Sequence, residues 1–520
     1  MFVSHLCLSI GFTLYFLAID FIYKIKFPNY IEFHKKLLKD ALVLWIVNII
    51  ILSIPDTKTQ MIIYTVCFFM VFVQQFHYAF FRSYLMPYEI VLFFVEGEEI
   101  VDTLKNTIQY MVLSIGIFLV SLLIVYVTLY KVTIHTMSVP YALEIFLLLL
   151  ATGMILIGKD KKNKFLPQRY FSSLRNTYNV LSLFFLQELP GLFREERKVF
   201  QPYRIKKCEN TVPQTVIVVM GESLSHKRMS LYGYEHKTTP NLEEKIDDDN
   251  FVFAKGFSSA TVTKTSVVEF FNMRREPENI EVISSQKANL FKLAKQQGYR
   301  THYVTTQKIN IMGNYVGDCD VVLSDKDLKK GDKLYDEVLV DYLEKVDFSE
   351  KNFIVLHQRN SHSPYEENVP EAFYRYDHKQ KDFHDYMVNS YMNSVLYTDH
   401  LFGKLFEKVD KLDKEAMVFV TSDHGEMLGF EDEKGCYGHT VLDYEVVKVP
   451  LMIYKNGRCR HTMNLDGVIS HYHFSKLIAK YIGYEVTNPN EDGTLFVNGT
   501  DMRGKHGFLQ YSEKDFYHVN

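Results

Sequence analysis

Long apolar runs dominate the first third of the chain, whereas the remainder alternates short apolar runs with polar stretches. Five runs are apolar enough to be membrane-spanning helices, since a span needs roughly 20 mostly apolar residues. They cover residues 3–22, 40–54, 60–81, 109–130 and 140–157, and the second and fifth are short. The first run lacks a basic start and a cleavage site, so we interpret it as a span rather than a signal peptide. The pattern predicts a five-span helical membrane domain over residues 1–158.

From about residue 212 the pattern becomes that of an α/β domain. Short apolar runs predict buried strands at residues 215–220, 299–306, 352–357, 416–422 and 449–454. Residues 289–298 and 389–409 lie between these runs and carry apolar side chains at helical spacing. Strands that alternate with helices predict a mainly parallel sheet covered on both faces. We expect a second domain over residues 212–520, joined to the first by a bridging segment at residues 159–211.

The positions of basic residues predict which side of the membrane each segment faces, and the side predicted for the second domain depends on the number of spans. Residues 23–40 and 158–165 are both basic, and the positive-inside rule places such segments in the cytoplasm. With five spans, this rule alone would put the second domain in the cytoplasm as well. The net charge of −4 gives no reason to expect a nucleic-acid partner. Six cysteines show no CxxC spacing and do not indicate a compartment.

Polar residues follow the predicted strands at their carboxyl ends, where sheets of this kind bind ligands. Glu222 follows the first strand, His357 and His362 follow the third, and Asp423 and His424 follow the fourth. Two carboxylates and an imidazole suit a divalent cation, zinc before manganese or magnesium. The alternative for a single carboxylate such as Glu222 is a position at a helix start, where the helix dipole stabilises it.

The stretch KGFSSATVTKTSVVEFF, residues 255–271, can supply a nucleophile. A hydroxyl attacks when a metal or a base lowers its pKa. Spacing alone does not choose among Ser259, Thr261, Thr263 and Thr265, and an ordinary Ser/Thr helix cap is the alternative.

Five motifs occur in an order that resembles the membrane-bound phosphoethanolamine transferases of the alkaline phosphatase/sulfatase superfamily. They are GES…YGY…TTPNL, the Thr-rich helix start, LHQ…SH.P, TSDHGE.LG and G.YGH. The resemblance covers nearly the whole chain, because that family also has five N-terminal spans followed by a periplasmic catalytic domain. It implies that Glu222, Asp423 and His424 bind one zinc ion and that Thr263 is both the nucleophile and a further ligand.

The resemblance also implies substrate contacts. His362 and His439 fall on histidines that hold the transferred phosphate or a second zinc ion. His357 lies five residues before His362, and we expect it to line the same pocket. Glu99, between the third and fourth spans, matches a glutamate of the membrane domain that contacts substrate. The chain departs from the family at Ser259 and Glu269, where the family carries a disulfide that flanks the nucleophile.

The implied activity is a phosphotransferase that moves phosphoethanolamine from phosphatidylethanolamine to a core sugar or lipid A of lipopolysaccharide, through a covalent phospho-threonine. The family places the protein in the bacterial inner membrane with its catalytic domain in the periplasm, against the charge bias, and we expect a monomer. Two alternatives stay open. One is a glycerol-phosphate transferase or a phosphate or sulfate ester hydrolase of the same superfamily, and the other is a non-catalytic membrane sensor or binding protein.

Overall fold

The computed structural model divides into two compact units, Met1–Glu195 with Gly435–Tyr437, and Glu196–Lys434 with Gly438–Asn520. Most residues of both units are described. The exceptions are residues 1, 28–36, 82–83, 88, 91–110, 132–137, 160–164, 166–169, 191–198, 209–210, 309–311, 313–318, 330, 332, 440, 501–506 and 513–520.

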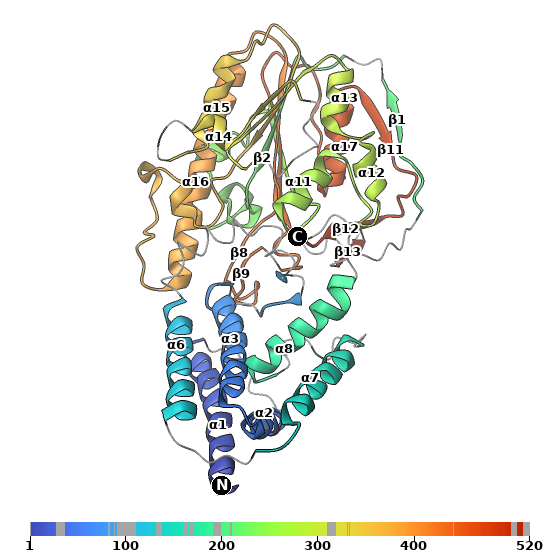
Figure 1. The fold of residues 1–520 in the computed structure, drawn as a ribbon. Helices are drawn as coiled ribbons and strands as arrows, with labels where there is room; N and C mark the ends of the chain where they lie inside the picture. Colours follow the sequence, from blue (N-terminus) through green and yellow to red (C-terminus); the bar gives the residue numbers. More distant parts are fainter. Residues whose placement is uncertain are drawn as a thin grey trace. The chain divides into compact units, whose positions relative to one another are not determined.

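The first unit is helical, and each predicted span coincides with a helix (Figure 1). Its helices are α1 (Phe2–Lys26), α2 (Leu37–Ser53), α3 (Thr57–Phe81), α6 (Val112–Tyr126), α7 (Ala142–Gly158) and α8 (Ser173–Leu183). Two π-helical turns, Val127–Lys131 and Phe184–Glu188, continue α6 and α8.

The predicted number of five spans is not confirmed. In the described part of the chain, three helices are long and apolar enough to cross a membrane: Phe2–Lys26, Thr57–Ala79 and Val112–Tyr130. The helices α2 and α7 have 17 residues each. At a rise of 1.5 Å per residue such a helix is about 26 Å long, short of the roughly 30 Å hydrocarbon core.

The helices of the first unit are joined by aromatic stacking and by buried carboxylates. Rings of α1 and α3 stack in the pairs Phe12–Tyr64 and Phe16–Phe68, each with centroids 4.4 Å apart. The carboxylate of Asp40 in α2 accepts the backbone N–H of Phe171 at 2.8 Å and pairs with Arg175 at 2.6 Å. The start of α8, which the sequence assigned to a bridging segment, is thereby fixed within the helical unit.

A seven-stranded sheet forms the centre of the second unit, in the order β3-β10-β7-β2-β6-β4-β5. The strands are β2 (Thr215–Gly221), β3 (Phe251–Phe257), β4 (Arg300–Thr305), β5 (Val321–Leu323), β6 (Asn352–His357), β7 (Ala416–Ser422) and β10 (Lys448–Lys455). The prediction of a mainly parallel sheet is confirmed, since β7, β2, β6, β4 and β5 are parallel. The sequence missed β3 and β5, and it did not show that β10 runs antiparallel to β7 and β3.

Helices cover both faces of this sheet (Figure 1). On one side lie α14 (Asp325–Leu328), α15 (Glu337–Asp341) and α16 (Phe383–Asp410); on the other lie α11 (Thr263–Phe271), α12 (Ile280–Ser285), α13 (Leu290–Gln296) and α17 (His471–Tyr481). Shorter elements are α10 (Pro240–Glu243), β1 (Arg204–Lys207), β8 (Met427–Leu428), β9 (Tyr437–Gly438), β11 (Tyr484–Thr487), β12 (Thr494–Asn498) and β13 (Phe508–Ser512). Every residue of β2 is buried, as expected for a central strand between two helical layers.

The strand register brings polar residues to one edge of the sheet. Gly221 pairs with Ser422 at the ends of β2 and β7, and Met220 pairs with His357 at the end of β6. The backbone N–H of Asp423 donates to the Gly221 carbonyl at 3.1 Å, which continues the β2–β7 pairing by one step. Glu222 and Asp423 therefore leave adjacent strands side by side.

Candidate metal centre

Glu222, Asp423 and His424 form a buried cluster at this edge of the sheet. Each offers one ligand atom, and the three atoms lie within 4.8 Å of one another. His424 Nε2 is 3.3 Å from Asp423 Oδ2 and 3.8 Å from Glu222 Oε1. None of the three side chains is more than 1% exposed. The structure thus brings together the three residues that the sequence predicted to bind a metal.

Asp423 is held so that one oxygen is left for a ligand. Its Oδ1 accepts the backbone N–H groups of Ser223 at 2.9 Å and His424 at 2.8 Å. Its Oδ2 is buried and accepts no hydrogen bond from the described residues. The Nδ1 of His424 lies 2.8 Å from the carbonyl of Gly425, which fits an N–H donor and leaves Nε2 as the lone-pair nitrogen that faces the cluster.

The turn after β2 fixes Glu222. Ser223 adopts a left-handed backbone conformation with φ of 53°, which is uncommon for a residue with a side chain and is found at functional sites. Its hydroxyl donates to Glu222 Oε1 at 2.8 Å, and the Gln307 amide donates to Oε2. Gln307 follows β4 at the same edge. Sequence reasoning missed it, although the position after a strand was a usable signal.

This ligand set fits a divalent cation. Burial raises the pKa of the Asp423 carboxyl, an effect opposed by His357 and by the Thr263 hydroxyl, and burial lowers the pKa of His424. Two carboxylates so close together in a buried site repel each other unless a positive charge lies between them. A bound cation removes that repulsion and uses the unpaired Asp423 oxygen. Carboxylate and imidazole ligands suit zinc before manganese or magnesium.

Of the four hydroxyl residues that the sequence left open, Thr263 is the one that reaches the cluster. It is half-buried at the first position of α11, and its Oγ1 lies 3.3 Å from His424 Nε2. The Thr265 hydroxyl donates to the carbonyl of Thr500 at 3.3 Å. Ser259 and Thr261 lie in the segment that leads to α11, and no described hydrogen bond joins the hydroxyl of either residue to the cluster.

A second group of candidate ligands shares His424. It consists of His424, Glu426 and His439, again with ligand atoms within 4.8 Å. The His424 and His439 rings have centroids 4.0 Å apart. His439 Nδ1 lies 3.1 Å from Glu426 Oε2, and the Tyr365 hydroxyl donates to Glu426 Oε1 at 2.7 Å. Glu426 was not among the predicted site residues, although it lies in the same motif as Asp423.

The other predicted substrate contacts differ in position. His362 is half-buried, and its pKa is lowered by burial and then by the charges of Arg359 and His439, so it faces the same region as His439. His357 is fully buried at the end of β6, its Nδ1 is 2.7 Å from the Tyr303 hydroxyl, and burial lowers its pKa to about 4. Glu99 lies outside the described residues.

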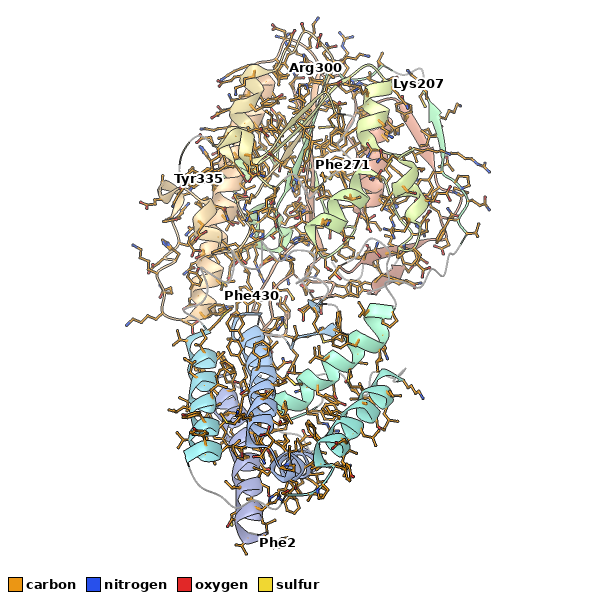
Figure 2. The ribbon with its side chains drawn as sticks, in the orientation of Figure 1. Phe2, Lys207, Phe271, Arg300, Tyr335 and Phe430 are labelled. Atoms are coloured by element: carbon orange, nitrogen blue, oxygen red, sulfur yellow. The ribbon has the colours of Figure 1, made fainter. Side chains whose placement is uncertain are left out.

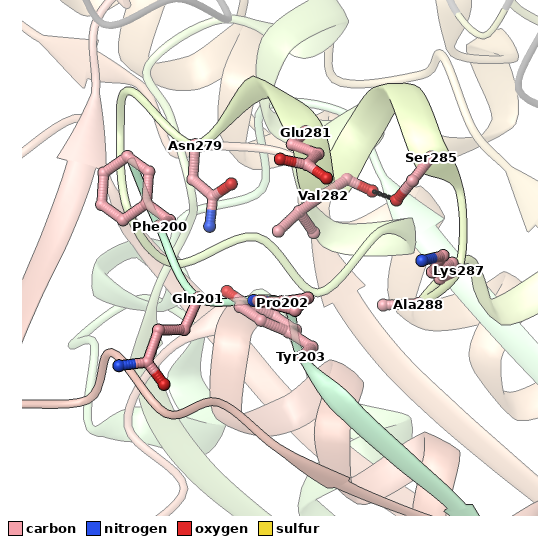
Figure 3. Close-up of a pocket in the computed structure, with 10 residues that line it drawn as sticks. All are labelled: Phe200, Gln201, Pro202, Tyr203, Asn279, Glu281, Val282, Ser285, Lys287 and Ala288. Carbon is pink, nitrogen blue, oxygen red and sulfur yellow. Dashed lines mark hydrogen bonds between the residues drawn. The ribbon is translucent and has the colours of Figure 1, made fainter. Parts of the chain in front are cut away.

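A separate pocket lies elsewhere in the second unit, between the segment before β1 and α12 (Figure 3). Phe200, Pro202 and Tyr203 line one wall, and Asn279 and Val282 line the other. No lining residue of this pocket belongs to the metal cluster. This pocket is therefore separate from the candidate metal centre.

Comparison with known proteins agrees with the class of fold. Residues 214–484 match the Sulfatase family, and the chain belongs to this family. The Kdo(2)-lipid A phosphoethanolamine 7''-transferase of Escherichia coli K12 is 25% identical over 323 residues. That match covers 59% of this chain and 55% of that protein, so the chain spans little more than half the length of this relative. The resemblance predicted from the motifs is confirmed.

Two solved structures share the fold. The integral membrane protein lipooligosaccharide phosphoethanolamine transferase A from Neisseria meningitidis has a TM-score of 0.63 and 17% identity, covering 92% of this chain and 95% of that one. The C-terminal periplasmic domain of EcEptC from Escherichia coli, in complex with Zn, has a TM-score of 0.51 and 20% identity, covering 61% and 97%. The first similarity extends over both units of the chain and the second covers about three fifths of it.

Proposed function

We propose that this chain transfers phosphoethanolamine from phosphatidylethanolamine to lipopolysaccharide, on a core sugar or on lipid A. The observation that carries the proposal is the position of Thr263 Oγ1, 3.3 Å from His424 Nε2 and beside two buried carboxylates. A hydroxyl at a metal cluster is the arrangement required for nucleophilic attack on phosphorus. The relatives named as phosphoethanolamine transferases support this choice of transferred group.

The first half-reaction uses Thr263 as the nucleophile. Glu222, Asp423 and His424 would hold a zinc ion, which when bound lowers the pKa of a neighbouring hydroxyl and neutralises charge on phosphate oxygens. A bond forms between Thr263 Oγ1 and phosphorus while the phosphorus–oxygen bond to diacylglycerol breaks. The proton that the threonine loses is balanced by the proton that the diacylglycerol oxygen gains. Phosphoethanolamine is then carried on Thr263.

The second half-reaction transfers the group to an acceptor hydroxyl or phosphate. The acceptor oxygen attacks phosphorus and gives up its proton, and Thr263 gains a proton as the bond between phosphorus and its Oγ1 breaks. In this proposal His362 and His439 contact the non-bridging oxygens in both steps, and Glu426 orients the His439 ring through Nδ1. The group around His424, Glu426 and His439 would hold a second ion if two are bound.

The proposed location follows from the substrates and the helical unit. Three apolar helices of spanning length suit an inner-membrane protein, and both the lipid donor and the lipopolysaccharide acceptor are membrane molecules. We place the second unit in the periplasm, because the EcEptC domain, which has a similar fold, is a periplasmic domain. We further propose that the chain is a monomer and that it crosses the membrane five times.

Replacement of Thr263 by alanine tests the proposed function. We expect Thr263→Ala to abolish release of diacylglycerol from labelled phosphatidylethanolamine, because the attacking oxygen is removed. Zinc measured by elemental analysis should remain bound, since three ligands persist. The matched control is Thr265→Ala, whose hydroxyl bonds to Thr500 and does not reach the cluster, and which should retain transfer.

Three results would contradict the proposal in different ways. Wild-type transfer by Thr263→Ala would exclude this nucleophile. Release of glycerol phosphate from phosphatidylglycerol, with no reaction of phosphatidylethanolamine, would indicate a glycerol-phosphate transferase. Binding of either lipid without any product would indicate a non-catalytic sensor or binding protein. Mass spectrometry of lipopolysaccharide from cells with and without the gene would identify the acceptor sugar.

A further inference from the structure

Asn498, at the end of β12, holds the backbone that leads to Thr263. Its N–H donates to the Ser259 carbonyl at 2.8 Å, and its carbonyl accepts the N–H of Thr261 at 3.1 Å. The side chain of Asn498 is 2% exposed. The segment before α11 is therefore paired to β12 through one residue that lies more than 230 positions further along the chain.

The same asparagine also holds α11 on the far side of Thr263. Its Nδ2 donates to Glu269 Oε1 at 2.7 Å. Glu269 in turn pairs with Arg274 at 2.9 Å, and neither side chain is more than 2% exposed. We name Ser259, Glu269, Arg274 and Asn498 the α11 clasp, because it joins a point four residues before Thr263 to a point six residues after it.

Other contacts connect α11 and the segment before it to the metal-binding strand. The backbone N–H of Ser259 donates to His471 Nδ1 at 3.1 Å, so His471 Nε2 carries its proton and faces the Thr421 hydroxyl of β7 at 3.1 Å. The Ser266 hydroxyl donates to the Asp423 carbonyl at 2.5 Å. A shift of α11 along its axis would strain these bonds, and the distance between Thr263 and the cluster is thereby restricted.

Stabilisation of the folded chain is by itself a weak explanation for a buried polar network of this kind. Taking an ion pair out of water costs about as much as its attraction returns, and apolar residues of similar volume often stabilise a core equally well. Buried hydrogen bonds have strict preferences of distance and direction, and they instead restrict the groups they join to one geometry. A fixed geometry is important at a nucleophile, because a misplacement of about 1 Å can lower the reaction rate by roughly 100-fold.

We propose that Asn498 is a positioning residue that sets the distance between the Thr263 hydroxyl and the metal cluster through the α11 clasp. This rests on the proposed function of Thr263. The Asn498 amide bonds to Glu269, which is not a member of the metal cluster. Its effect is therefore on the turnover step and on the order of the segment around Thr263, with substrate affinity and metal content left unchanged.

The test uses the full chain in detergent or liposomes with labelled phosphatidylethanolamine. For Asn498→Ala we expect kcat to fall roughly 10- to 100-fold, with KM and zinc content within about twofold of wild type. Amide hydrogen exchange over residues 259–266 should become faster. The matched control is Asn456→Ala, another fully buried asparagine, whose amide bonds to Lys414 at the opposite edge of the sheet. It should lower thermal stability and leave the kcat of the folded protein unchanged.

Exchange of the amide and the carboxylate between positions 498 and 269 tests the hydrogen bond between these two side chains. Asn498→Asp should be worse than Asn498→Ala, because a second carboxylate then faces Glu269. Adding Glu269→Gln to Asn498→Asp keeps the total charge and restores a hydrogen bond of opposite direction between the two positions. We expect the double variant to recover most of the kcat that Asn498→Asp loses. This comparison remains decisive if Asn498→Ala fails to fold.

Two outcomes would overturn the inference: unchanged kcat and unchanged hydrogen exchange in Asn498→Ala, or no recovery in the double variant. Failure of the proposed function would give a different result, because the wild-type chain would then show no transfer. The hydrogen-exchange comparison still decides whether the clasp orders the segment in that case.

Discussion

At the scale of the residue, Asp423 shows how a side chain can be held and yet remain able to bind a metal. Its Oδ1 is used by two backbone donors, while Oδ2 accepts no hydrogen bond from the described residues. A buried acceptor without a partner costs roughly 1–3 kcal/mol. A cation at this point removes that cost, which is why the orientation of Asp423 favours a ligand role over a structural one.

Loss of a ligand should therefore lower metal content. We expect Asp423→Asn and His424→Ala each to reduce zinc affinity by at least about tenfold, since direct ligands contribute more than the outer partners whose loss costs 10- to 100-fold. Elemental analysis after dialysis measures this. The control is Asp399→Asn, a buried aspartate of α16 that accepts from the backbone of Asn241 and Leu242. Unchanged zinc in both cluster variants would place the ligands elsewhere.

At the scale of the element, α11 presents Thr263 because its other end is anchored in the core. Phe270 and Phe271 are fully buried, and Figure 2 labels Phe271. The centroids of the Phe271 ring and of the Phe291 ring in α13 are 4.9 Å apart. The first turn can thus expose a hydroxyl to the cluster while the last turn packs. A helix of nine residues would be marginal without this packing.

Truncation of Phe271 tests the anchoring of α11. We expect Phe271→Ala to reduce the free energy of unfolding by about 3–5 kcal/mol, the usual cost of removing a buried phenylalanine ring. Denaturant-induced unfolding measures the difference. Phe348→Ala, at a half-buried position beside α16, should cost less than half as much. Equal losses in the two variants would mean that α11 is not held by its apolar end.

At the scale of the whole molecule, buried histidines couple folding to pH. His226 and His471 are at most 4% exposed, and burial lowers the pKa of each to about 3. An unfolded histidine has a pKa near 6.5. Between pH 6.5 and about 3 the unfolded chain therefore binds protons that the folded chain does not, so the stabilisation present above pH 6.5 is lost as the pH falls.

We accordingly expect the second unit to lose stability in mild acid. Each of the two histidines should lower the free energy of unfolding by up to about 1.4 kcal/mol per pH unit below pH 6.5. The thermal midpoint at pH 5.5 should be lower than at pH 7.5, and His226→Gln should make the pH dependence less steep. A midpoint independent of pH over this range would contradict the expectation.

The sequence by itself determined the apolar helices, five strands of the sheet and the three residues of the metal cluster. These depend on local patterns: long apolar runs, short buried runs, and polar residues directly after strands. The same logic could have found Gln307 and Glu426, which lie at the same edge. Span number was not determined, because a short apolar helix and a spanning helix have the same local pattern.

The motif resemblance pointed to Thr263, whereas residue spacing left four hydroxyl residues open. Only the tertiary structure showed that the Thr263 hydroxyl reaches the cluster, that β10 is antiparallel and that Asn498 forms the clasp. Each of these depends on contacts between residues far apart in the chain. Periodicity reports which face of an element is buried, and it does not report which distant residue meets that face. The neighbours of a hydroxyl and the direction of a strand are set by packing of the whole domain.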